Sequence, residues 1–415
     1  GGEAENRGGE STLGNLVAEI QRWATRTPAL GGAQIAFMNP GGLRADLRGV
    51  NKAGEDAGPY PRTVNVRGAA NVQPFANSLV NMKLTGAQIE EVLEQQWQPE
   101  ESSRPFLRLG TSAGFTYTYE PPAADAPAGT KGEVLNMWLN GEPIDPAAKY
   151  SVTVNSFLSG GGDNFTTFRD GTEKAEAGMT DLEAQVAYFN ANVSAQNPLK
   201  VDYSQRAVGV KGLPDAFAPG TEYTVELSSL SMTGPSDVVD DEVLVFLGDE
   251  ALGRFPVTTV APPAGNANSS DEIGTATVKF TVPEGSTAVP GDLIIFGAKT
   301  WTCVGPMVCP RPAEKATAKL KVNAKPAKAI VKKTRVKIIS VVKAAGAAAK
   351  GRIEVKIGGK TYKAKLNKNG RAVVKLKKFA KVGKKTVRVK YLGNKTTTAA
   401  SAKATFKVVK PKKKK

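Results

Sequence analysis

Histidine is absent from all 415 residues of this sequence. It is the only side chain whose ordinary pKa lies near neutrality, and it is the commonest protein ligand for transition metals. Its absence removes the usual general base and most transition-metal catalytic sites from this chain. We therefore expect neither a catalytic residue nor a metal-binding residue here, and a binding role whose chemistry another domain supplies.

Cysteine is almost as scarce, because Cys303 and Cys309 are the only two in the chain. Their C-x5-C spacing is too wide for a C-x-x-C redox motif, and the sequence has no second pair that could complete a zinc site. A short disulfide loop in an oxidising compartment is the favoured interpretation. Two unpaired thiols in a cytosolic protein are the alternative.

Long apolar runs are also missing. No run reaches the roughly 18 residues that a membrane-spanning helix requires, so no transmembrane segment is predicted. The sequence shows no signal peptide, but it opens on Gly-Gly without Met. This start is consistent with numbering that begins inside a longer precursor.

Acidic residues are nearly absent from the last hundred positions. Residues 316–415 contain 33 Lys and Arg side chains and one acidic residue, Glu354. Of the chain totals of 56 basic and 39 acidic residues, 23 and 38 are then left in the first 315 positions. The two regions carry net charges of +32 and −15, and this difference in sign indicates different roles.

Helical and strand patterns alternate over residues 1–210, which predicts a layered α/β domain. Five segments are predicted strands: Ile35–Met38, Leu79–Leu84, Phe115–Tyr119, Glu133–Leu139 and Tyr150–Val154. Three segments are predicted helices: the first follows Ser11 or Thr12 as its cap, the second follows Thr85 and buries Ile89, Val92, Leu93 and Trp97, and the third is Asp181–Phe189.

Beyond residue 211 the helical patterns stop. Short strand-like runs separated by Pro, Gly, Asn and Asp predict a β-sandwich over residues 211–315. A Pro/Ala/Lys linker is expected over 310–330, a lysine-rich Ig-like β domain over 316–410, and a disordered basic tail over 411–415. The predicted fold is multidomain, with an α/β layered domain followed by two β-sandwich domains.

A glycine-containing motif follows the first predicted strand and reads Asn39-Pro-Gly41-Gly42-Leu-Arg44. Glycines at a strand end allow the backbone to come close to a ligand, and an arginine fork suits a phosphate or a carboxylate. An ordinary loop with a surface arginine is the alternative interpretation.

Two further motifs each contain a phenylalanine among polar residues. The first runs from Val72 to Asn77, and its Phe75 is either a stacking ring or a core residue that precedes a strand.

The second motif reads Asn155-Ser-Phe157-Leu-Ser-Gly-Gly161-Gly162-Asp163-Asn-Phe165. Its three consecutive glycines can approach a ligand, and Asp163 offers a carboxylate to sugar hydroxyls or base nitrogens. A flexible glycine loop with a capping aspartate is the alternative.

The order and spacing of these motifs resemble the C-terminal domain of the 5'-nucleotidase family. That family includes bacterial periplasmic nucleotidase/UDP-sugar hydrolases and animal ecto-5'-nucleotidases. Its pattern of N-x-G-G-[IL]-R, V-x-P-F-x-N, T-G at a helix start and F-L-x-x-G-G-D-x-F occurs here in that order. The resemblance covers roughly residues 5–210, and four ordered motifs are not expected to agree by chance.

The resemblance implies a role for each matching position. Phe75 and Phe157 would hold the nucleobase between them, because every base has a π face on which an aromatic ring can stack. Asn39 and Arg44 would reach the phosphate and ribose, and Asp163 would bind the ribose hydroxyls. The implied set is completed by Gly41, Gly42, Asn77, Gly161, Gly162 and, as the arginine that relatives place ahead of the first helix, Arg7.

Catalysis in that family belongs to a separate N-terminal metallophosphoesterase domain, whose two divalent metal ions activate water. The histidine-bearing motifs of that domain do not occur in this sequence. The resemblance therefore implies the substrate-recognition portion of an exported 5'-nucleotidase that acts on a nucleoside 5'-monophosphate or a related nucleotide. Alone, this chain is expected to bind without turnover, with the catalytic domain as its partner.

The basic end of the chain admits several interpretations. Its lysines alternate with Val, Ile and Leu, as in a solvated strand face, so a soluble module is the simplest interpretation. A second hypothesis is that residues 316–415 dock on an anionic cell-envelope polymer. A non-catalytic surface or adhesion protein that retains the nucleotide-binding fold is the rival to a nucleotidase. A nucleic-acid-binding protein is a further alternative.

Overall fold

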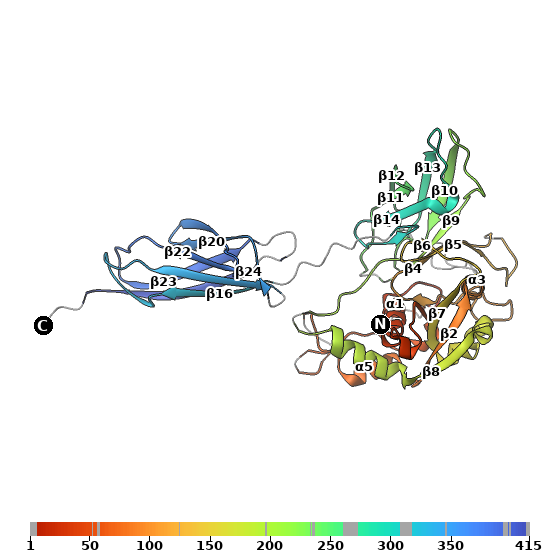
Figure 1. The fold of residues 1–415 in the computed structure, drawn as a ribbon, viewed down its shortest axis with the longest axis horizontal. Helices are drawn as coiled ribbons and strands as arrows, with labels where there is room; N and C mark the ends of the chain where they lie inside the picture. Colours follow the sequence, from red (N-terminus) through yellow and green to blue (C-terminus); the bar gives the residue numbers. More distant parts are fainter. Residues whose placement is uncertain are drawn as a thin grey trace. The chain divides into compact units, whose positions relative to one another are not determined.

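The computed structural model describes residues 6–51, 53–55, 59–123, 125–195, 197–232, 234, 237–259, 273–307, 318–344, 347–392, 397 and 400–411. The chain forms two compact units, Gly1–Cys309 and Pro310–Lys415. In Figure 1 the first unit runs from red to blue-green, and the second is blue.

The first sheet supports the candidate site and has the strand order β3-β1-β7-β2-β8. The strands are β1 (Ile35–Met38), β2 (Ser78–Thr85), β3 (Gly110–Thr111), β7 (Lys149–Asn155) and β8 (Thr172–Thr180). β1 runs parallel to β7, whereas the other neighbours are antiparallel. All four residues of β1 are buried, as expected for a strand that is covered on both faces.

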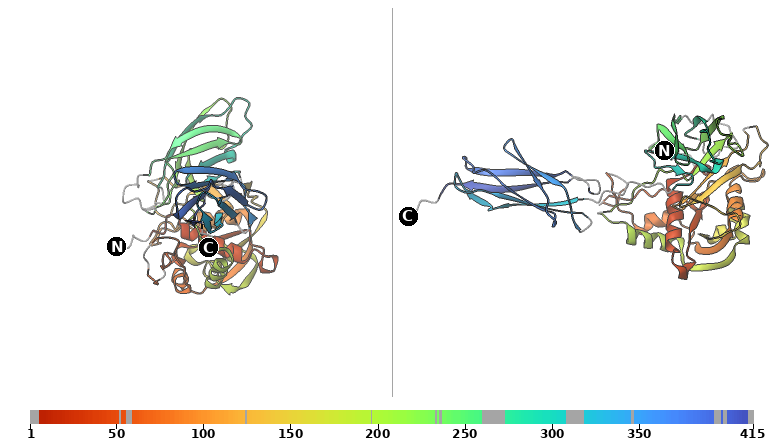
Figure 2. Two further views of the ribbon diagram at one scale, coloured as in Figure 1. Left: turned by 90° about the vertical axis from the view of Figure 1, so that its left-hand side faces the viewer. Right: turned by 45° about the horizontal axis from the view of Figure 1, so that its top comes forward.

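Helices cover both faces of this sheet, and α1 and α3 stand on opposite sides of it in the right-hand view of Figure 2. They are α1 (Thr12–Ala24), α3 (Gly86–Glu94) and α5 (Asp181–Asn192), and two short helices, α2 (Val66–Val72) and α4 (Ser156–Ser159), lie near the strand ends. Each long helix begins at a hydroxyl cap, in which Ser11, Thr85 or Thr180 accepts a hydrogen bond from a first-turn amide.

A second sheet, of six strands, separates two hydrophobic cores. Its order is β13-β10-β9-β4-β5-β6, and its strands are β4 (Phe115–Glu120), β5 (Glu133–Leu139), β6 (Glu142–Pro143), β9 (Ala207–Lys211), β10 (Glu222–Ser228) and β13 (Ala276–Thr281). Tyr117 and Ala207 pack into the core that contains the first sheet and α3. Val208 and Val210 face the opposite core, because successive strand residues point to opposite faces.

The predicted boundary between residues 210 and 211 falls inside β9. This strand pairs with β4, from before the boundary, and with β10, from after it. A single sheet therefore crosses the position at which the sequence pattern places the end of the α/β domain.

A four-stranded sheet closes the second core. It contains β11 (Glu242–Leu247), β12 (Glu250–Pro256), β14 (Leu293–Gly297) and β15 (Cys303–Val304) in the order β12-β11-β14-β15. Val243 and Val245 of β11 pack with Val225 of β10. This sheet and the six-stranded sheet form the first β-sandwich.

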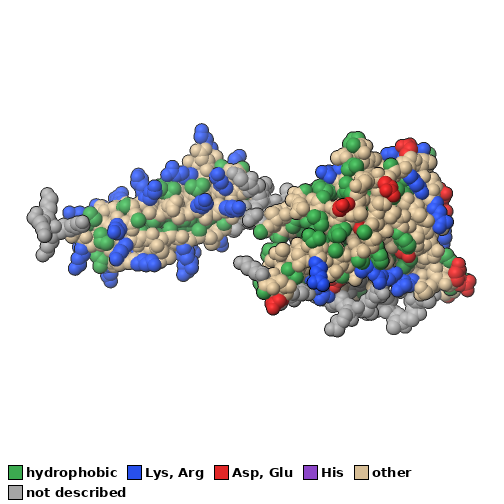
Figure 3. Space-filling view, turned by 90° about the horizontal axis from the view of Figure 1, so that it is seen from below, with side chains coloured by type: hydrophobic (Ala, Val, Ile, Leu, Met, Phe, Trp, Pro, Cys, Tyr) green, Lys and Arg blue, Asp and Glu red, His purple; other side chains and the backbone are tan. Residues whose placement is uncertain are grey.

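The second unit is an all-β sandwich. One sheet joins β16 (Ala318–Lys325), β18 (Lys337–Ala344), β19 (Ala347–Ala348) and β22 (Arg371–Lys375). The other joins β17 (Lys328–Ile330), β20 (Arg352–Ile357), β21 (Lys360–Lys365), β23 (Gly383–Tyr391) and β24 (Ala400–Val409). On the face seen in Figure 3, Lys and Arg side chains cover this unit and no Asp or Glu is visible.

The predicted fold class is confirmed, since an α/β layered region is followed by β-sandwich modules. Two local expectations are wrong. The linker expected over residues 310–330 contains β16 and β17, because alternating Ala, Leu and Val side chains between the lysines supply an inner face. Trp97 lies beyond the end of α3, where it is buried and bridges to Phe106. Residues 412–415 of the predicted tail lie outside the described residues.

Candidate functional site

Three segments meet at one edge of the first sheet. β1 and β7 are parallel, so the residues that follow each of them leave the sheet at the same edge. β2 is antiparallel to β7, and Leu79 pairs with Asn155, so the residues before β2 enter at that edge as well. The register therefore brings together residues 39–44, 73–77 and 155–165, which hold all the predicted site residues except Arg7.

Buried amide side chains join two of these segments. Asn39 is 3% exposed, and its Nδ2 donates to Asp163 Oδ2 at 2.8 Å. Asn155 Nδ2 donates to Asn39 Oδ1 at 3.1 Å, while Asn155 Oδ1 accepts from the Leu158 amide and caps α4. Asn39 therefore holds one oxygen of the half-buried Asp163 carboxylate in a fixed position.

Gly41 lies between an acid and a base. A Cβ atom at this position would be 3.0 Å from Arg7 Nη1 and 3.3 Å from Asp163 Oδ2. The Arg7 guanidinium and the Asp163 carboxylate therefore flank the same glycine, and a side chain there would crowd both. The Arg7 carbonyl accepts a hydrogen bond from the Arg108 amide at 2.8 Å, which holds the backbone of Arg7 beside Arg108.

Arg44 joins the loop after β1 to the loop before β2. Its amide donates to the Val72 carbonyl at 2.9 Å, and its Nη1 donates to the Gly41 carbonyl at 3.3 Å. Its guanidinium carbon lies 6.0 Å from the centre of the Phe75 ring. Gly42 is buried beside Met38, the last residue of β1.

The two phenylalanines of the site are both exposed. Phe75 is 58% exposed and Phe157 is 47% exposed, whereas large aromatic side chains are usually buried. Phe157 stands on α4, and its ring packs on Gly162, where a Cβ would lie 2.4 Å from Phe157 Cε1. Ser156 Oγ donates to Asn77 Oδ1 at 3.5 Å, so the residue before Phe157 contacts a residue two positions after Phe75.

Asp163 itself adopts an uncommon backbone conformation, with φ of 55°. Two polar contacts hold the turn at Asp163. Gln98 Nε2 donates to the Asp163 carbonyl at 3.1 Å, and Asn164 Nδ2 donates to Gln98 Oε1 at 2.8 Å. Arg169 Nε donates to the Gly160 carbonyl at 2.8 Å. The Arg169 guanidinium fills the space that a side chain at Gly161 would occupy.

Sequence reasoning missed these supporting residues, Gln98, Asn155 and Arg169. Asn155 stands at the start of a motif and was available as a helix-cap signal. Gln98 lies some 65 residues from Asp163 and carries no local signal. Asn77 is also tied to an unpredicted partner, since its carbonyl accepts from the Asp181 amide at 2.9 Å. Burial raises the pKa of the Asp181 carboxyl, although hydrogen bonds from Leu182 and Asn77 oppose this effect.

A buried charged cluster supports the segment that carries Arg7. Glu10 is 5% exposed and accepts hydrogen bonds from Asn15 Nδ2 at 2.6 Å and from the amides of Arg206 and Ala207 at 2.8 and 3.1 Å. Burial raises the pKa of the Glu10 carboxyl, and the hydrogen bond from Asn15 and the charge of Arg108 oppose that rise. Glu10 thus ties the start of α1 to β9.

Metal-ligand clusters and membrane-spanning helices were sought over the described ranges. In those ranges no three His, Cys, Asp or Glu side chains gather closely enough to hold a metal ion. No helix there has both the length and the apolar character that crossing a bilayer requires. Cys303 is disulfide-bonded, and Cys309, its predicted partner, lies outside the described residues.

Comparison with known proteins finds similarities in the first part of the chain. Residues 2–170 match the family model described as "5'-nucleotidase, C-terminal domain". Cell wall protein Lmo0130 of Listeria monocytogenes is 34% identical over 229 residues, which is 54% of this chain and 27% of that protein. NAD 5'-nucleotidase of Haemophilus influenzae is 28% identical over 168 residues, which is 39% of this chain and 25% of that protein.

Among solved structures, a 5'-nucleotidase precursor from Thermus thermophilus aligns with a TM-score of 0.38 and 28% identity. The alignment covers 49% of this chain and 36% of that one. The chain thus spans about a quarter of the length of the two curated relatives named above.

Proposed function

From the premise that residues 2–170 carry a 5'-nucleotidase C-terminal domain, we propose that the first unit recognises a nucleotide substrate. The observation that carries this proposal is the convergence of three loops at one sheet edge. There, an amide-held carboxylate and an arginine flank a glycine, next to two exposed phenylalanines.

The aromatic rings account for binding of the base. Phe75 and Phe157 leave roughly half of their surfaces open to solvent, and an exposed apolar ring gains most when a flat partner covers it. Stacking on an aromatic ring contributes roughly 1–3 kcal/mol per base. Arg44, whose guanidinium lies 6.0 Å from the Phe75 ring centre, adds a positive charge beside the base and phosphate positions.

The polar groups account for orientation of the sugar and phosphate. Asp163 is an acceptor for ribose hydroxyls, and Asn39 keeps its carboxylate in place. Arg7 and Arg44 attract the phosphate, while Gly41 and Gly42 leave room for it next to the backbone. Together they would hold the phosphoryl group in one orientation. In-line displacement requires such an orientation, because the attacking water must approach the phosphorus opposite the leaving group.

The hydrolytic step itself would belong to a metallophosphoesterase domain outside residues 1–415. Two divalent metal ions in that domain would activate the attacking water. The side chains of this chain would bind and orient the nucleotide, and release of inorganic phosphate from a nucleoside 5'-monophosphate or a related nucleotide would follow in the assembled enzyme.

Calorimetric titration of the chain with AMP, adenosine and inorganic phosphate tests the proposal. We expect AMP to bind, and Phe157→Ala to weaken it about 10- to 100-fold, as loss of one stacking contact predicts. Phe157→Tyr retains a ring and is expected to bind normally, whereas Phe157→Leu retains only apolar volume and is expected to resemble the Ala variant. Equal affinity of the wild type and the three Phe157 variants for AMP would contradict stacking of the base on Phe157.

A phosphatase assay with added Mn²⁺ or Zn²⁺ accompanies the titration. We expect binding without turnover by the chain alone. The coding sequence upstream of residue 1 is a second, independent check, because a nucleotidase requires D-x-H and G-N-H-[DE] motifs for its metal ions.

A second candidate function is a non-catalytic cell-surface protein, and the 34% identity to a cell wall protein favours it. Under either function we propose an exported protein. Cell fractionation tests the location, and failure of AMP, adenosine and UDP-glucose to bind at millimolar concentration would favour the non-catalytic surface role.

A further inference from the structure

Lysines stand in direct register on the outer face of one sheet of the second unit. In the antiparallel pairing, Lys325 of β16 is opposite Lys337 of β18, and Lys337 is opposite Lys375 of β22. All three side chains are exposed. Directly opposite Cβ atoms lie about 4.5–5.5 Å apart, so three positive charges form one line across three strands. We call these three residues the lysine row.

Such an arrangement opposes folding of the isolated unit. Like charges directly opposite one another destabilise a sheet, and a surface that serves solubility alone mixes both signs. The single acidic residue of positions 316–415, Glu354, lies on the other sheet, where it contacts Lys363 at 3.6 Å. Among the described residues of this unit Glu354 is the only acidic side chain, so no described carboxylate neutralises the lysine row, and its charges are suited to an external anion.

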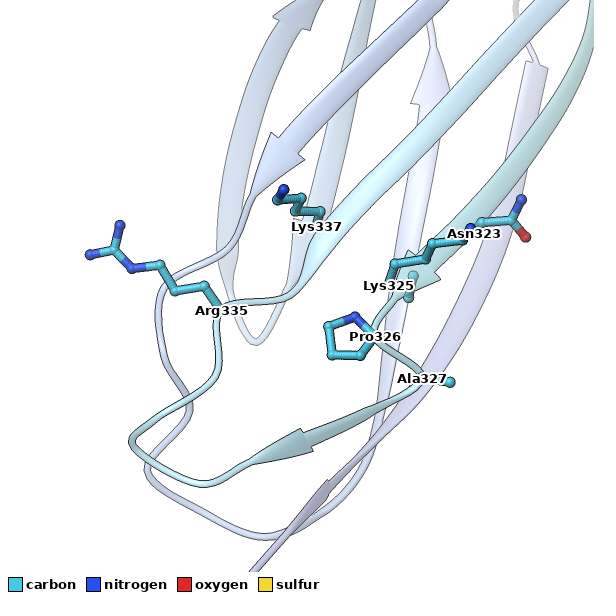
Figure 4. Close-up of a pocket in the computed structure, with 7 residues that line it drawn as sticks. Asn323, Lys325, Pro326, Ala327, Arg335 and Lys337 are labelled. Carbon is cyan, nitrogen blue, oxygen red and sulfur yellow. The ribbon is translucent and has the colours of Figure 1, made fainter.

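A groove begins at one end of this row. It has a volume of about 720 Å³ and is lined by Asn323, Lys325, Pro326, Arg335 and Lys337, together with Ala324 and Ala327. Figure 4 shows that its basic side chains come from three segments: Lys325 from β16, Lys337 from β18, and Arg335 from the loop before β18. The groove adds a fourth positive charge to the lysine row.

The opposite face repeats the pattern. Lys356 of β20 pairs with Arg388 of β23, which pairs with Lys403 of β24. The large exposed apolar residues of the described part of this unit are Ile330, Val373, Val382 and Leu392, none of them aromatic. A surface for single-stranded nucleic acid uses aromatic rings on which bases stack, so the chemistry here fits a polyanion that has no bases.

We propose that the lysine row and its groove bind a linear phosphodiester polymer without bases, of the polyol-phosphate type. Lysine acts as a mobile point charge for phosphate and does not impose the two-pronged geometry of arginine. A row of lysines therefore suits a flexible chain of repeating phosphates. Binding releases the counterions that such a polymer condenses, which makes the affinity strongly dependent on salt.

The test compares two triple variants of the full chain that have the same net charge. One removes the row, Lys325→Gln with Lys337→Gln and Lys375→Gln. The control removes three exposed loop lysines, Lys368→Gln with Lys378→Gln and Lys381→Gln. The probe is a synthetic poly(glycerol phosphate) of defined length, and binding is measured by calorimetry at several NaCl concentrations.

We expect the row variant to bind about 100-fold more weakly than the wild type, taking a roughly fivefold loss per lysine next to an anionic surface. Its slope of log affinity against log salt should shrink by about 2, since each neutralised phosphate of a single strand contributes about 0.7. The control should lose less than about 10-fold. Without polymer, the row variant should melt at a higher temperature than the control, because the repulsion across the strands is gone.

Three outcomes would overturn the proposal. Equal losses in the two triple variants would show that only the total charge matters. Tighter binding of single-stranded DNA with the same number of phosphates would identify a nucleic acid as the preferred partner. Undetectable binding of the polymer to the wild type at 0.15 M NaCl would remove the site altogether.

Discussion

The contact between Asn39 and Asp163 links residues 124 positions apart in the chain, and each of the two side chains has a second neighbour in the site. Asn39 is held by Asn155, and Asp163 lies beside Gly41 and Arg7. A buried donor that loses its acceptor costs about 1–3 kcal/mol, whereas a neutral acceptor in the same place preserves the bond. Charge and hydrogen bonding at Asp163 can therefore be separated by substitution.

Asp163→Asn is expected to leave the unfolding free energy nearly unchanged and to weaken AMP binding about 10-fold or more, since hydrogen bonds to a charged group contribute roughly 1.5–3 kcal/mol. Asp163→Ala should weaken binding and also destabilise the first unit. Calorimetric titration and urea unfolding measure the two effects. A 2',3'-dideoxy AMP that distinguishes wild type from Asp163→Asn as strongly as AMP does would contradict a contact with the ribose hydroxyls.

Glu10 gives a prediction about pH. Its folded-state pKa is raised above the ordinary value of 4.5 by burial. A carboxyl with a raised folded pKa favours folding fully below its unfolded pKa, and this contribution is lost as pH rises through the folded value. Relative to Glu10→Gln, which does not titrate, the wild type should therefore become progressively less stable as the pH rises above the ordinary pKa of 4.5.

Urea unfolding of both proteins across that range measures the difference. Arginine side chains in general keep their charge over this range, so they do not alter the sign. A wild type that becomes more stable relative to Glu10→Gln as the pH rises would mean that the hydrogen bonds from Asn15, Arg206 and Ala207 outweigh burial and lower the folded pKa.

Among the α-helices of the described residues, α4 is the shortest, with four residues and a single asparagine cap. Asn155 caps this helix and also donates to Asn39, so one side chain sets both the position of Phe157 and the orientation of Asp163. Asn65 is a matched control, because it caps α2 through the Gly68 amide at 2.7 Å on an exposed surface.

Asn155→Ala is expected to destabilise the first unit by about 1–3 kcal/mol, because it removes a cap and leaves a buried partner unpaired. AMP binding should weaken with it. Asn65→Ala should cost about 1 kcal/mol and leave the affinity unchanged. Thermal unfolding and AMP titration are the measurements, and equal binding losses in the two variants would show that Asn155 has no special role at the site.

The contrast between β1 and β8 shows what the sequence can reveal of these elements. Ile35–Met38 is apolar throughout and was predicted at its observed bounds, as was Glu133–Leu139. The other three strands predicted in residues 1–210 end within one residue of the observed bounds. β8 escaped prediction, because its residues Thr172–Thr180 are mostly exposed, Met179 is its only large apolar side chain, and the strand pairs only with β2 at the edge of the sheet. This strand forms because it pairs with β2, which is distant in the sequence. Its own composition does not indicate a strand.

The site shows the same limit. The family-like motifs identified Asn39, Arg44, Phe75, Phe157 and Asp163, and the structure brings their segments together at one sheet edge. Their functional roles stay predictions. The residues that hold the site in shape were not predictable, because Gln98 acts through a contact across 65 positions and leaves no periodic or local signal.

At the scale of the whole molecule, the two units differ in their response to salt. Residues 316–415 carry a net charge of +32, and repulsion among these charges weakens as the Debye length falls from about 10 Å at 0.1 M to about 3 Å at 1 M salt. Two calorimetric transitions are expected. The one from the second unit should rise by about 5 °C or more with added NaCl, since 1 kcal/mol shifts the melting temperature of a domain of this size by about 4–8 °C.

The first unit, with both signs of charge on its surface, should move much less. Assignment of the transitions follows from the row variant, whose substitutions affect only the second unit. A second transition that falls with salt, or a single transition at every salt concentration, would contradict this division.

The strand that joins the two cores of the first unit decides where this polypeptide can be cut. β9 is bordered by β4 on one side and β10 on the other, so a protease or a gene break at residue 210 would leave bare strand edges that invite aggregation. The α/β region and the sandwich beside it must therefore be inherited together when genes recombine. The chain can instead be divided after residue 309, between the two compact units, when either unit is to be fused to another protein.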